Sequence, residues 1–381
     1  MKLQKICIIG DGLSGLAVAA ALQNLNLDID LYCKKNKFSF GSDNRTTAIS
    51  DSNLKFIITK ILLKKPLYFW PCEKISLFYE GNKKYLNFIN FLKEKKKLMY
   101  VFKNNLFKKD LIKIIKKTKK IKLINKKVTE LNYEKSSIRI KKKFIYYDLI
   151  ILCTGNNSEF YKKIENNRSI KKDYNQVAIT SDIKHNFIIG GASQYFLKQG
   201  PMAILPFNKN IFSLVWSIDK NYFYENKKRI KLIIKEKLNS IFNKKFKIKI
   251  SPIKYFPISL NLKTQYYKKN TLILGEGLHS IHPVAGQGFN LVLRDIDNLY
   301  NLIKKNLNLG LAIKDSLILK DFSSNRKSEN LFFGIGIDLI NEFFKNNKLI
   351  NPIREVILEN IKNNSYIKKI SKKISNKGLQ V

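Results

Sequence analysis

Residues 6–9 (Ile-Cys-Ile-Ile) run directly into residues 10–15 (Gly-Asp-Gly-Leu-Ser-Gly), a G-x-G-x-x-G segment. The four apolar residues predict a central parallel strand that is buried on both faces. The small apolar residues 16–22 predict a helix, and residues 29–32 predict a second strand within the usual βαβ span. This order of elements is typical of a Rossmann-like dinucleotide-binding domain.

The glycines of this segment predict where a dinucleotide binds. Gly10 permits a tight turn, Gly12 lets the backbone approach a pyrophosphate, and Gly15 lets the helix pack closely on the strand. Leu13 and Ser14 open the helix, whose first N–H groups and positive dipole suit phosphate groups. We therefore expect a nucleotide cofactor at this turn.

A second glycine-rich segment occupies residues 275–288, directly after apolar residues that predict another buried strand. Its last three residues, Gly286, Gln287 and Gly288, open a predicted helix. The dipole of that helix can stabilise negative charge on a ligand, as an oxyanion site does. Four apolar residues recur at helical spacing and predict its core-facing side: Phe289, Leu293, Ile296 and Leu299.

Hydrophobic periodicity elsewhere predicts a β-rich insertion and further helices. Helices are predicted from near Asp51, at residues 105–117 and at residues 230–242. Strands are predicted at residues 71–91, 121–147, 148–155, 212–218 and 246–250. The alternation in residues 212–218 indicates a sheet whose apolar face packs on a second domain or a ligand.

The charge balance is unusual, because the 381 residues include 72 Lys and Arg against 29 Asp and Glu, a net charge of +43. Only seven of the basic residues are Arg, which nucleic-acid-binding proteins use heavily for bidentate contacts. The lysines are spread along the chain beside many Ile, Asn, Phe and Tyr residues, which favours a codon bias over a selected basic patch. We therefore expect no nucleic-acid partner.

Four widely spaced cysteines and three histidines argue against a disulfide framework and against a metal site. No run of about 20 apolar residues occurs, so we expect no transmembrane segment. The sequence predicts an intracellular protein that is soluble or peripheral to a membrane.

Three segments resemble, in order, the motifs of the FAD-dependent aromatic hydroxylases, the para-hydroxybenzoate hydroxylase-like group. They are residues 10–15, residues 153–158 (Cys-Thr-Gly-Asn-Asn-Ser) and residues 275–295. Within the third, residues 282–290 (His-Pro-Val-Ala-Gly-Gln-Gly-Phe-Asn) are similar to the ubiquinone-biosynthesis hydroxylase family of that group. Residues 45–50 also resemble the Arg loop that contacts flavin in that family, as residues 200–206 resemble a strand of its substrate domain.

The resemblance implies an α/β fold with a Rossmann-like FAD-binding domain, an inserted antiparallel β substrate domain and C-terminal helices. It implies an FAD-dependent monooxygenase that uses NAD(P)H and O₂ to hydroxylate the aromatic ring of a polyprenylated ubiquinone precursor. It further implies a cytoplasmic enzyme peripheral to the inner membrane, and it leaves open membership of a multi-enzyme quinone-biosynthesis complex. The resemblance assigns the redox chemistry and the activation of oxygen to the cofactor. The protein mainly has to bind and orient that cofactor, which explains why glycines and helix starts dominate the motifs.

Domain boundaries and site residues follow from the same resemblance. The predicted parts are a discontinuous FAD-binding domain (1–70, 100–165 and 265–310), a substrate domain (71–99 and 166–264) and a C-terminal helical region (311–381). The predicted cofactor-binding residues are Gly10, Gly12, Leu13, Ser14, Gly15, Arg45, Gly275, Glu276, Pro283, Gly286, Gly288 and Asn290. The predicted catalytic residues are His282, Gly286, Gln287 and Gly288, and no metal ligand is predicted.

Four residues depart from the family pattern. Cys33 replaces the acidic residue that binds a ribose hydroxyl, so that contact must be weaker or come from elsewhere. Thr154 replaces the usual Asp of the middle motif, and Tyr161 stands where an Arg often closes it. Glu276 replaces the Asp of the third motif and keeps a carboxylate on a longer arm.

These departures keep other functions open: a non-catalytic flavin-binding or flavin-free scaffold subunit of a quinone-biosynthesis complex, a flavin reductase or dehydrogenase, and a nucleic-acid binder. Single residues also have two interpretations. His279 and His282 suit acid–base chemistry or, more often in such loops, structural hydrogen bonds, and Arg294 favours a structural ion pair. The aromatic residues Phe207, Phe212 and Trp216 suit a pocket or the core, and the region around Arg354 suits a packing helix more than a membrane-surface helix.

Overall fold

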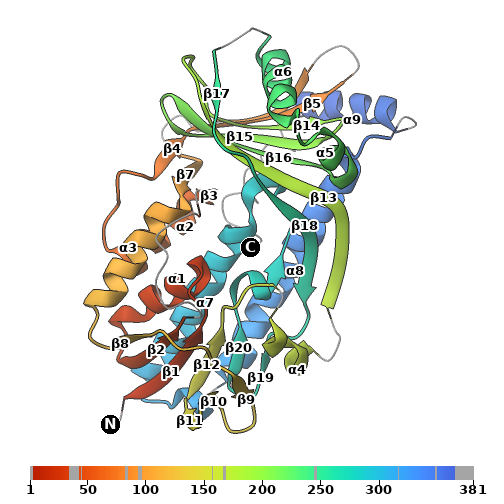
Figure 1. The fold of residues 1–381 in the computed structure, drawn as a ribbon. Coiled ribbons are helices and arrows are strands. Elements are labelled where there is room, and N and C mark those ends of the chain that lie inside the picture. The colour runs from red at the N-terminus through yellow and green to blue at the C-terminus, as the bar shows by residue number, and fades with distance from the viewer. Residues whose placement is uncertain are drawn as a thin grey trace.

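The computed structural model describes residues 3–33, 43, 45–81, 85–92, 97–156, 158–165, 169–243, 247–315, 317–347 and 350–364. Two large sheets dominate the fold, one in the lower and one in the upper part of Figure 1. The long helix α8 (Ile318–Phe344) runs from the lower sheet to the upper one (Figure 1).

The first sheet has six strands in the spatial order β19 (Tyr267–Lys268), β20 (Thr271–Ile273), β12 (Leu149–Leu152), β1 (Gln4–Ile9), β2 (Leu27–Tyr32) and β8 (Ile121–Ile124). All neighbours pair in parallel except β19 and β20. Residues 6–9 lie in the central strand and are buried, as their apolar run predicts. The predicted α/β class with a Rossmann-like domain is confirmed.

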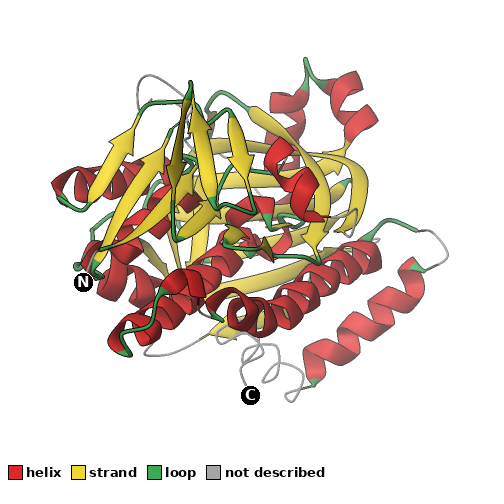
Figure 2. Ribbon diagram, turned by 90° about the horizontal axis from the view of Figure 1, so that it is seen from below, coloured by secondary structure: helices red, strands yellow, loops and turns green. Residues whose placement is uncertain are grey.

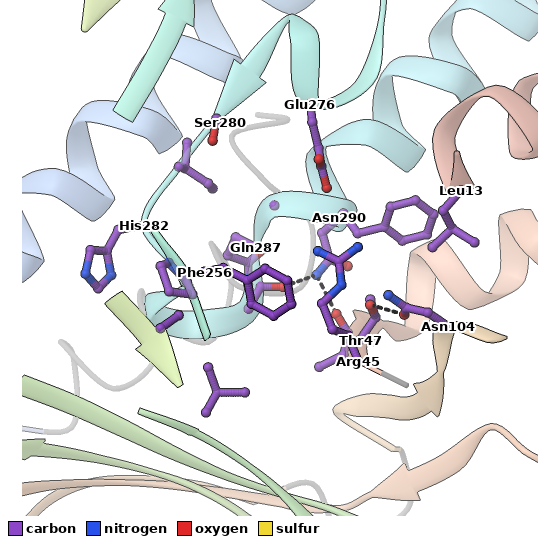
Figure 3. A pocket seen from close by; sticks show the side chains of 18 of the residues that line it. Leu13, Arg45, Thr47, Asn104, Phe256, Glu276, Ser280, His282, Gln287 and Asn290 are labelled. Atoms are coloured by element: carbon purple, nitrogen blue, oxygen red, sulfur yellow. Dashed lines mark hydrogen bonds between the residues drawn. The ribbon is translucent and has the colours of Figure 1, made fainter. Parts of the chain in front are cut away.

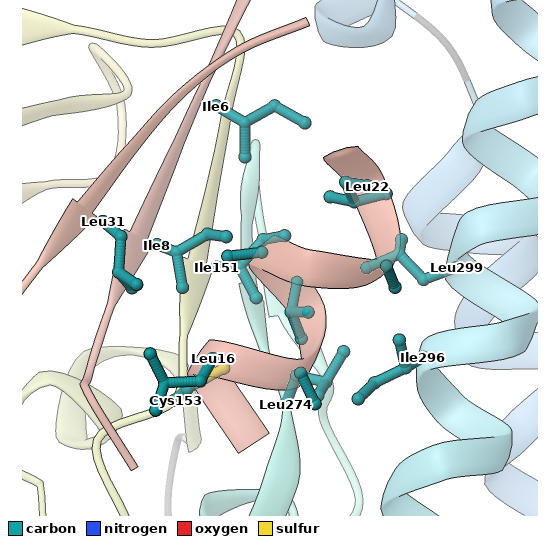
Figure 4. Close-up of a cluster of buried hydrophobic side chains, with 14 of the residues drawn as sticks. Ile6, Ile8, Leu16, Leu22, Leu31, Ile151, Cys153, Leu274, Ile296 and Leu299 are labelled. Carbon is teal, nitrogen blue, oxygen red and sulfur yellow. The ribbon is translucent and has the colours of Figure 1, made fainter. Parts of the chain in front are cut away.

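Helix α1 (Leu13–Ala21) packs on this sheet and contacts α3 (Asn104–Lys117) and α7 (Gly288–Asn308). Figure 4 shows it between the strands and α7, with Leu22 close to Leu299. The close approach requires Gly15, because a Cβ there would overlap the carbonyl oxygen of Gly10. Gly10 has a φ of 126°, and its own Cβ would overlap the carbonyl oxygen of Cys153.

The second sheet has nine strands. Eight follow the order β21 (His279–Ser280), β18 (Lys254–Lys263), β13 (Ser169–Lys184), β16 (Ile211–Asp219), β15 (Gly200–Asn208), β14 (Ala192–Leu197), β5 (Lys74–Glu80) and β6 (Tyr85–Leu92). The ninth, β17 (Lys249–Ile250), pairs with β13 and is shorter than the predicted strand at residues 246–250, whose first residue lies outside the described ranges. Strand β21 belongs to the second glycine-rich segment, which therefore joins both sheets.

One face of the second sheet packs on helices α5 (Lys220–Asn226) and α6 (Ile230–Phe242). Phe212 and Trp216 point to that face and are fully buried in its core. Of the two interpretations given for the aromatic residues, core packing is confirmed for Phe212 and Trp216, while Phe207 is only partly buried and packs against a separate, smaller core cluster. The opposite face of the same strands carries Ala203, Leu205 and Val215 toward the cavity described below.

Two three-stranded sheets complete the described strands: β3 (Thr46–Ser50), β7 (Met99–Lys103) and β4 (Trp70–Cys72), then β9 (Glu130–Asn132), β10 (Ser137–Ile140) and β11 (Lys143–Tyr146). The remaining helices are α2 (Asp51–Phe56), α4 (Lys162–Glu165) and α9 (Asn351–Asn363). In Figure 2, α9 lies on the outside of the molecule, beyond the end of α8. Within the described ranges, no helix is long and apolar enough to span a bilayer.

Candidate active site

A cavity of about 1500 Å³ lies between the two sheets. Sites for one small ligand usually measure roughly 300–1000 Å³, so this cavity has room for more than one molecule. Most of the predicted site residues line it: Gly10, Gly12, Leu13, Ser14, Arg45, Glu276, His282, Pro283, Gly286, Gln287, Gly288 and Asn290. Gly15 and Gly275 lie behind its wall, where they allow close packing.

Gly12 forms part of the wall at the start of α1. It is the N-cap residue of that helix, and no side chain caps the helix end. A Cβ at Gly12 would have no protein atom within 4 Å, so the backbone is open to the cavity. The first-turn N–H groups and the positive end of the helix therefore form a cradle for phosphate groups.

The Gly286–Gly288 turn forms a second helix start on the same wall. Gly286 has a φ of 61°, and α7 begins at Gly288 without a side-chain cap. A Cβ at Gly288 would reach no atom closer than Ile281 Cγ1, at 4.0 Å. The two glycine-rich segments also contact each other, because a Cβ at Gly275 would lie 2.7 Å from Ser14 Oγ.

Arg45 and Glu276 place opposite charges in the cavity. The Arg45 guanidinium donates two hydrogen bonds to Asp43, at 2.7 and 2.8 Å, and lies 5.3 Å from the ring centre of Phe256. Its side chain stays 45% exposed. Glu276 is exposed on the opposite side of the same space and points toward Arg45 (Figure 3). Arg45 thus offers a planar donor group to a ligand while Asp43 fixes its position.

Asn290 joins the second turn to the Arg loop, which is a different role from the predicted cofactor contact. Its Nδ2 donates to the carbonyl oxygens of Ala48 and Gly286, both at 3.0 Å. Its Oδ1 accepts from Ser50 N at 2.9 Å and from Asn53 Nδ2 at 2.7 Å. A carboxamide has two N–H donors and two acceptor positions, so no group is left for a cofactor.

His282 is fully buried and holds the loop before the second turn. Its Nδ1 accepts from Val284 N at 3.2 Å, and its Nε2 lies 2.9 Å from Gln176 Oε1. Burial lowers the pKa of His282 to about 4, which keeps the ring neutral near pH 7. Since both ring nitrogens are engaged, the geometry favours a positioning role over the predicted catalytic one.

A buried ionic cluster holds the same segment from the other side. Asp295 in α7 contacts His279 Nε2 at 2.6 Å and accepts from Arg326 Nε at 2.7 Å and Asn330 Nδ2 at 3.1 Å. Burial alone would raise the pKa of the Asp295 carboxyl, but Arg326 and His279 hold it below its ordinary value. The structural role favoured for His279 is confirmed, because the ring lies against a buried carboxylate.

The predicted ion pair of Arg294 is also present. Its guanidinium donates to Glu329 in α8 at 2.9 Å. Arg326 of α8 pairs with Asp295 of α7, so the two arginines attach α8 to α7 next to the third motif.

Two departures from the family pattern contact each other. Thr154 Oγ1 donates to the hydroxyl of Tyr161 at 2.9 Å, and a Cβ at Gly277 would overlap that tyrosine. A neutral hydrogen-bonded pair thus occupies the place where the family has an acid and often an arginine. The pair ties the middle motif to the third one.

At the far end of β2, lysines and one acidic residue, Asp11, line the cavity. Cys33 lines it, and burial raises the pKa of its thiol to about 12, so the thiol stays protonated. Lys108, Lys126 and Lys127 line the same end. Sequence reasoning missed these lysines, because nothing local separates them from the other lysines of the chain.

The opposite arm of the cavity is apolar, and its residues were also missed. They come from β5, β6, β14, α8 and α9: Leu77, Phe88, Ile89, Phe91, Phe196, Ile340, Phe343, Phe344, Leu358 and Ile361. Phe344 stacks on Phe196 with ring centres 3.6 Å apart. We call this region the apolar arm.

The polar part of the cavity fits FAD in its chemistry. The open backbone at Gly12 suits a pyrophosphate, and the Gly286–Gly288 turn offers a second helix start to a ring that gains negative charge. Arg45 supplies a partly exposed cation between them.

The chain matches known flavoproteins along most of its length. Residues 141–326 match the family model of the FAD binding domain. The mitochondrial ubiquinone biosynthesis monooxygenase COQ6 of Dictyostelium discoideum is 25% identical over 342 residues, which cover 71% of this chain and 69% of that enzyme. The 3-demethoxyubiquinol 3-hydroxylase of Escherichia coli K12 is 31% identical over 169 residues, 42% of this chain and 41% of that enzyme.

A solved structure shows the same fold. The p-nitrophenol 4-monooxygenase PnpA of Pseudomonas putida DLL-E4 superposes with a TM-score of 0.78 at 12% identity, covering 100% of this chain and 99% of that one. Fold, motifs and cavity together define an FAD-dependent monooxygenase. Within that class, the chain is similar to the aromatic hydroxylases that resemble para-hydroxybenzoate hydroxylase, and both relatives described above are named as enzymes that act in ubiquinone biosynthesis or on a ubiquinol.

Proposed function

We propose that the chain hydroxylates the aromatic ring of a polyprenylated ubiquinone precursor, with FAD as cofactor, NAD(P)H as reductant and O₂ as oxidant. The observation that carries the proposal is the two-part cavity. A glycine-rich polar region continues into the apolar arm within one space of about 1500 Å³. A substrate with a polar ring and a long isoprenoid tail has the same two parts. The names of the relatives support this substrate class.

Each region of the cavity has a distinct task in this proposal. Gly12, Leu13 and Ser14 bind the pyrophosphate through backbone N–H groups and the dipole of α1, while Gly10 forms the tight turn before them and donates its own N–H to the carbonyl oxygen of Tyr32. Bound FAD supplies the redox chemistry and the activation of oxygen. We assign the flavin ring to the Gly286–Gly288 turn, where the N-terminus of α7 stabilises negative charge.

The residues around that turn keep it in position. Asn290 fixes it to the Arg loop, His282 fixes the preceding loop, and Asp295 fixes α7 to its neighbours. Glu276 and Pro283 complete the wall beside it. The apolar arm excludes water and holds the tail, so the ring of the substrate is oriented by the part of it that does not react.

The proposed substrate also implies where the enzyme works. A polyprenylated substrate resides in a membrane, so we infer that the enzyme works at the cytoplasmic surface of the inner membrane without crossing it. The net charge of +43 favours anionic headgroups. Association with other quinone-biosynthesis enzymes stays a prediction.

The absorbance spectrum of the purified protein tests the proposal first. We expect a bound-flavin spectrum that bleaches with NAD(P)H under anaerobic conditions. On admitting O₂ with a polyprenylated phenol, mass spectrometry should show a product that contains one more oxygen atom. Purified protein that neither carries nor takes up flavin would contradict the proposal, and bleaching without product would point to a flavin reductase.

A further inference from the structure

The C-terminal half of α8 carries an apolar face on its outer side. Phe333 and Ile337 are buried against the protein body, as expected for an amphipathic helix. The opposite side presents Phe332, Ile335 and Leu339, which are 47%, 42% and 63% exposed. A solvated helix face normally carries polar side chains, so these residues require another explanation.

Helix α9 has a similar second apolar face. Arg354 and Leu358 are buried and attach the helix to the protein, which confirms the predicted packing role. Ile353, Val356 and Ile357 form a neighbouring stripe at helical spacing and are 61%, 59% and 40% exposed. The packing of α9 therefore accounts for one apolar face and leaves the other in contact with solvent.

Both exposed faces adjoin the apolar arm of the cavity. Ile340, one residue after Leu339 in α8, lines the arm and is itself 41% exposed. Leu358, one residue after Ile357 in α9, also lines it. The exposed apolar surface and the interior of the arm are thus neighbouring parts of the same two helices.

The charge of the following sequence matches an anionic partner. The 17 residues after α9 and its cap, residues 365–381, contain five Lys and no Asp or Glu. An apolar helix face that is followed in the sequence by a lysine-rich segment is typical of regions that bind the surface of anionic membranes.

We propose that the outer faces of α8 and α9 dock the protein on an anionic lipid bilayer, beside the apolar arm. We define this docking face by Phe332, Ile335, Leu339, Ile353, Val356 and Ile357. The proposal rests on the proposed function, because it gives the tail of a membrane-dissolved substrate a short route into the arm. Headgroups attract the lysines, and the acyl region receives the apolar side chains.

Flotation of the full chain with phosphatidylcholine vesicles, with and without phosphatidylglycerol, tests the docking face. We expect binding that requires phosphatidylglycerol and weakens at high salt. The double variant Leu339→Glu/Ile353→Glu should bind at least roughly 100-fold more weakly, about tenfold for each side chain. The control Leu309→Glu lies at the end of α7 and starts from the same 63% exposure as Leu339, and it should bind within about twofold of the parent.

Three outcomes would overturn the docking face. The parent chain fails to float with anionic vesicles, or the control loses as much binding as the double variant. In the third, sedimentation shows that the parent is a dimer and the double variant a monomer, while vesicle binding is the same for both. This result would assign the face to a second copy of the chain.

Flavin content and hydroxylation of a short-chain phenol in vesicle-free solution separate this inference from the proposed function. Both should be unchanged in the double variant, because its substituted residues do not line the cavity. Vesicle binding without hydroxylation would contradict the function and leave the docking face intact. Hydroxylation without vesicle binding would contradict the docking face and leave the proposed function intact.

Discussion

The two glycine-rich segments reach similar geometry by different means. At residues 10–15, close backbone contacts require glycine at two positions, since a Cβ at Gly10 or Gly15 would overlap a neighbouring carbonyl oxygen. At the Gly286–Gly288 turn, a Cβ meets no atom closer than 3.7 Å. That turn is held instead by hydrogen bonds that the side chains of Asn290, His282 and Asp295 form with more distant parts of the chain. The first segment is therefore fixed by close backbone contacts, one of them with Cys153, and the second by tertiary hydrogen bonds.

The largest effect should come from Gly15→Val. Overlap with a backbone carbonyl in the centre of the fold should cost more than about 4 kcal/mol and abolish cooperative unfolding. Gly12→Val is the matched control, because its side chain enters open space, and it should keep the parental melting temperature but lose flavin. Thermal melts and flavin absorbance of both variants measure the difference between them. Equal melting temperatures would show that a Cβ at Gly15 is tolerated and would contradict the steric argument.

Asp295→Ala should be the most damaging change around the second segment. It leaves Arg326 and His279 buried without their carboxylate, at a cost of about 3–5 kcal/mol in the free energy of unfolding. Asp297→Ala, two residues along the same helix, should cost less than about 1 kcal/mol. Urea unfolding of both variants is the measurement. Similar losses would mean that the ionic cluster does not hold the segment.

His282 should make stability depend on pH. Its folded pKa of about 4 lies below the ordinary value of 6.5, so between these values the unfolded chain binds more protons. Its contribution is complete above about pH 6.5 and is lost as the pH falls toward 4, by up to about 3 kcal/mol. One such group adds a slope of up to about 1.4 kcal/mol per pH unit to the pH dependence of the unfolding free energy. His282→Asn should remove this slope between pH 7 and 5. An unchanged slope would remove His282 from the account.

The smallest effect concerns Cys33, at the lysine-lined end of the cavity. Cys33→Glu restores the acidic group that binds a ribose hydroxyl in the family, and one such charged hydrogen bond is worth about 1.5 kcal/mol. We expect FAD to bind roughly tenfold more tightly. Fluorescence titration of the apoprotein with FAD measures this, with Cys33→Ser as the control that adds no charge. Weaker binding would mean that the lysines at this end already provide the contact.

The same contrast explains how much of the molecule could be predicted. Residues 6–32 form the predicted strand, helix and strand, because their burial pattern and glycine spacing act over a few residues. Helix α6 has the predicted bounds for a similar reason. The requirement for glycine at Gly10 and Gly15 could be predicted because close backbone contacts leave no room for a Cβ there.

What could not be predicted depends on contacts between distant residues. Three of the four partners given above for Asn290 lie about 240 residues earlier in the chain, so its saturated hydrogen bonds leave little local signal. The alternation in β16 predicted a strand correctly, but only the packing of α5 and α6 decides which face is core. The apolar arm combines five elements, and each alone has the pattern of an ordinary core segment.

The central claim is that the flavin ring reacts at the Gly286–Gly288 turn. Gly288→Val tests it most directly, because the added side chain has space in the folded protein but projects from the helix start that should meet the ring. Loss of one such stabilising contact costs about 3 kcal/mol, so kcat for hydroxylation should fall roughly 100-fold. Flavin content and melting temperature should stay near those of the parent. Parental hydroxylation by the folded, flavin-loaded variant would contradict the claim and place the reacting centre elsewhere in the cavity.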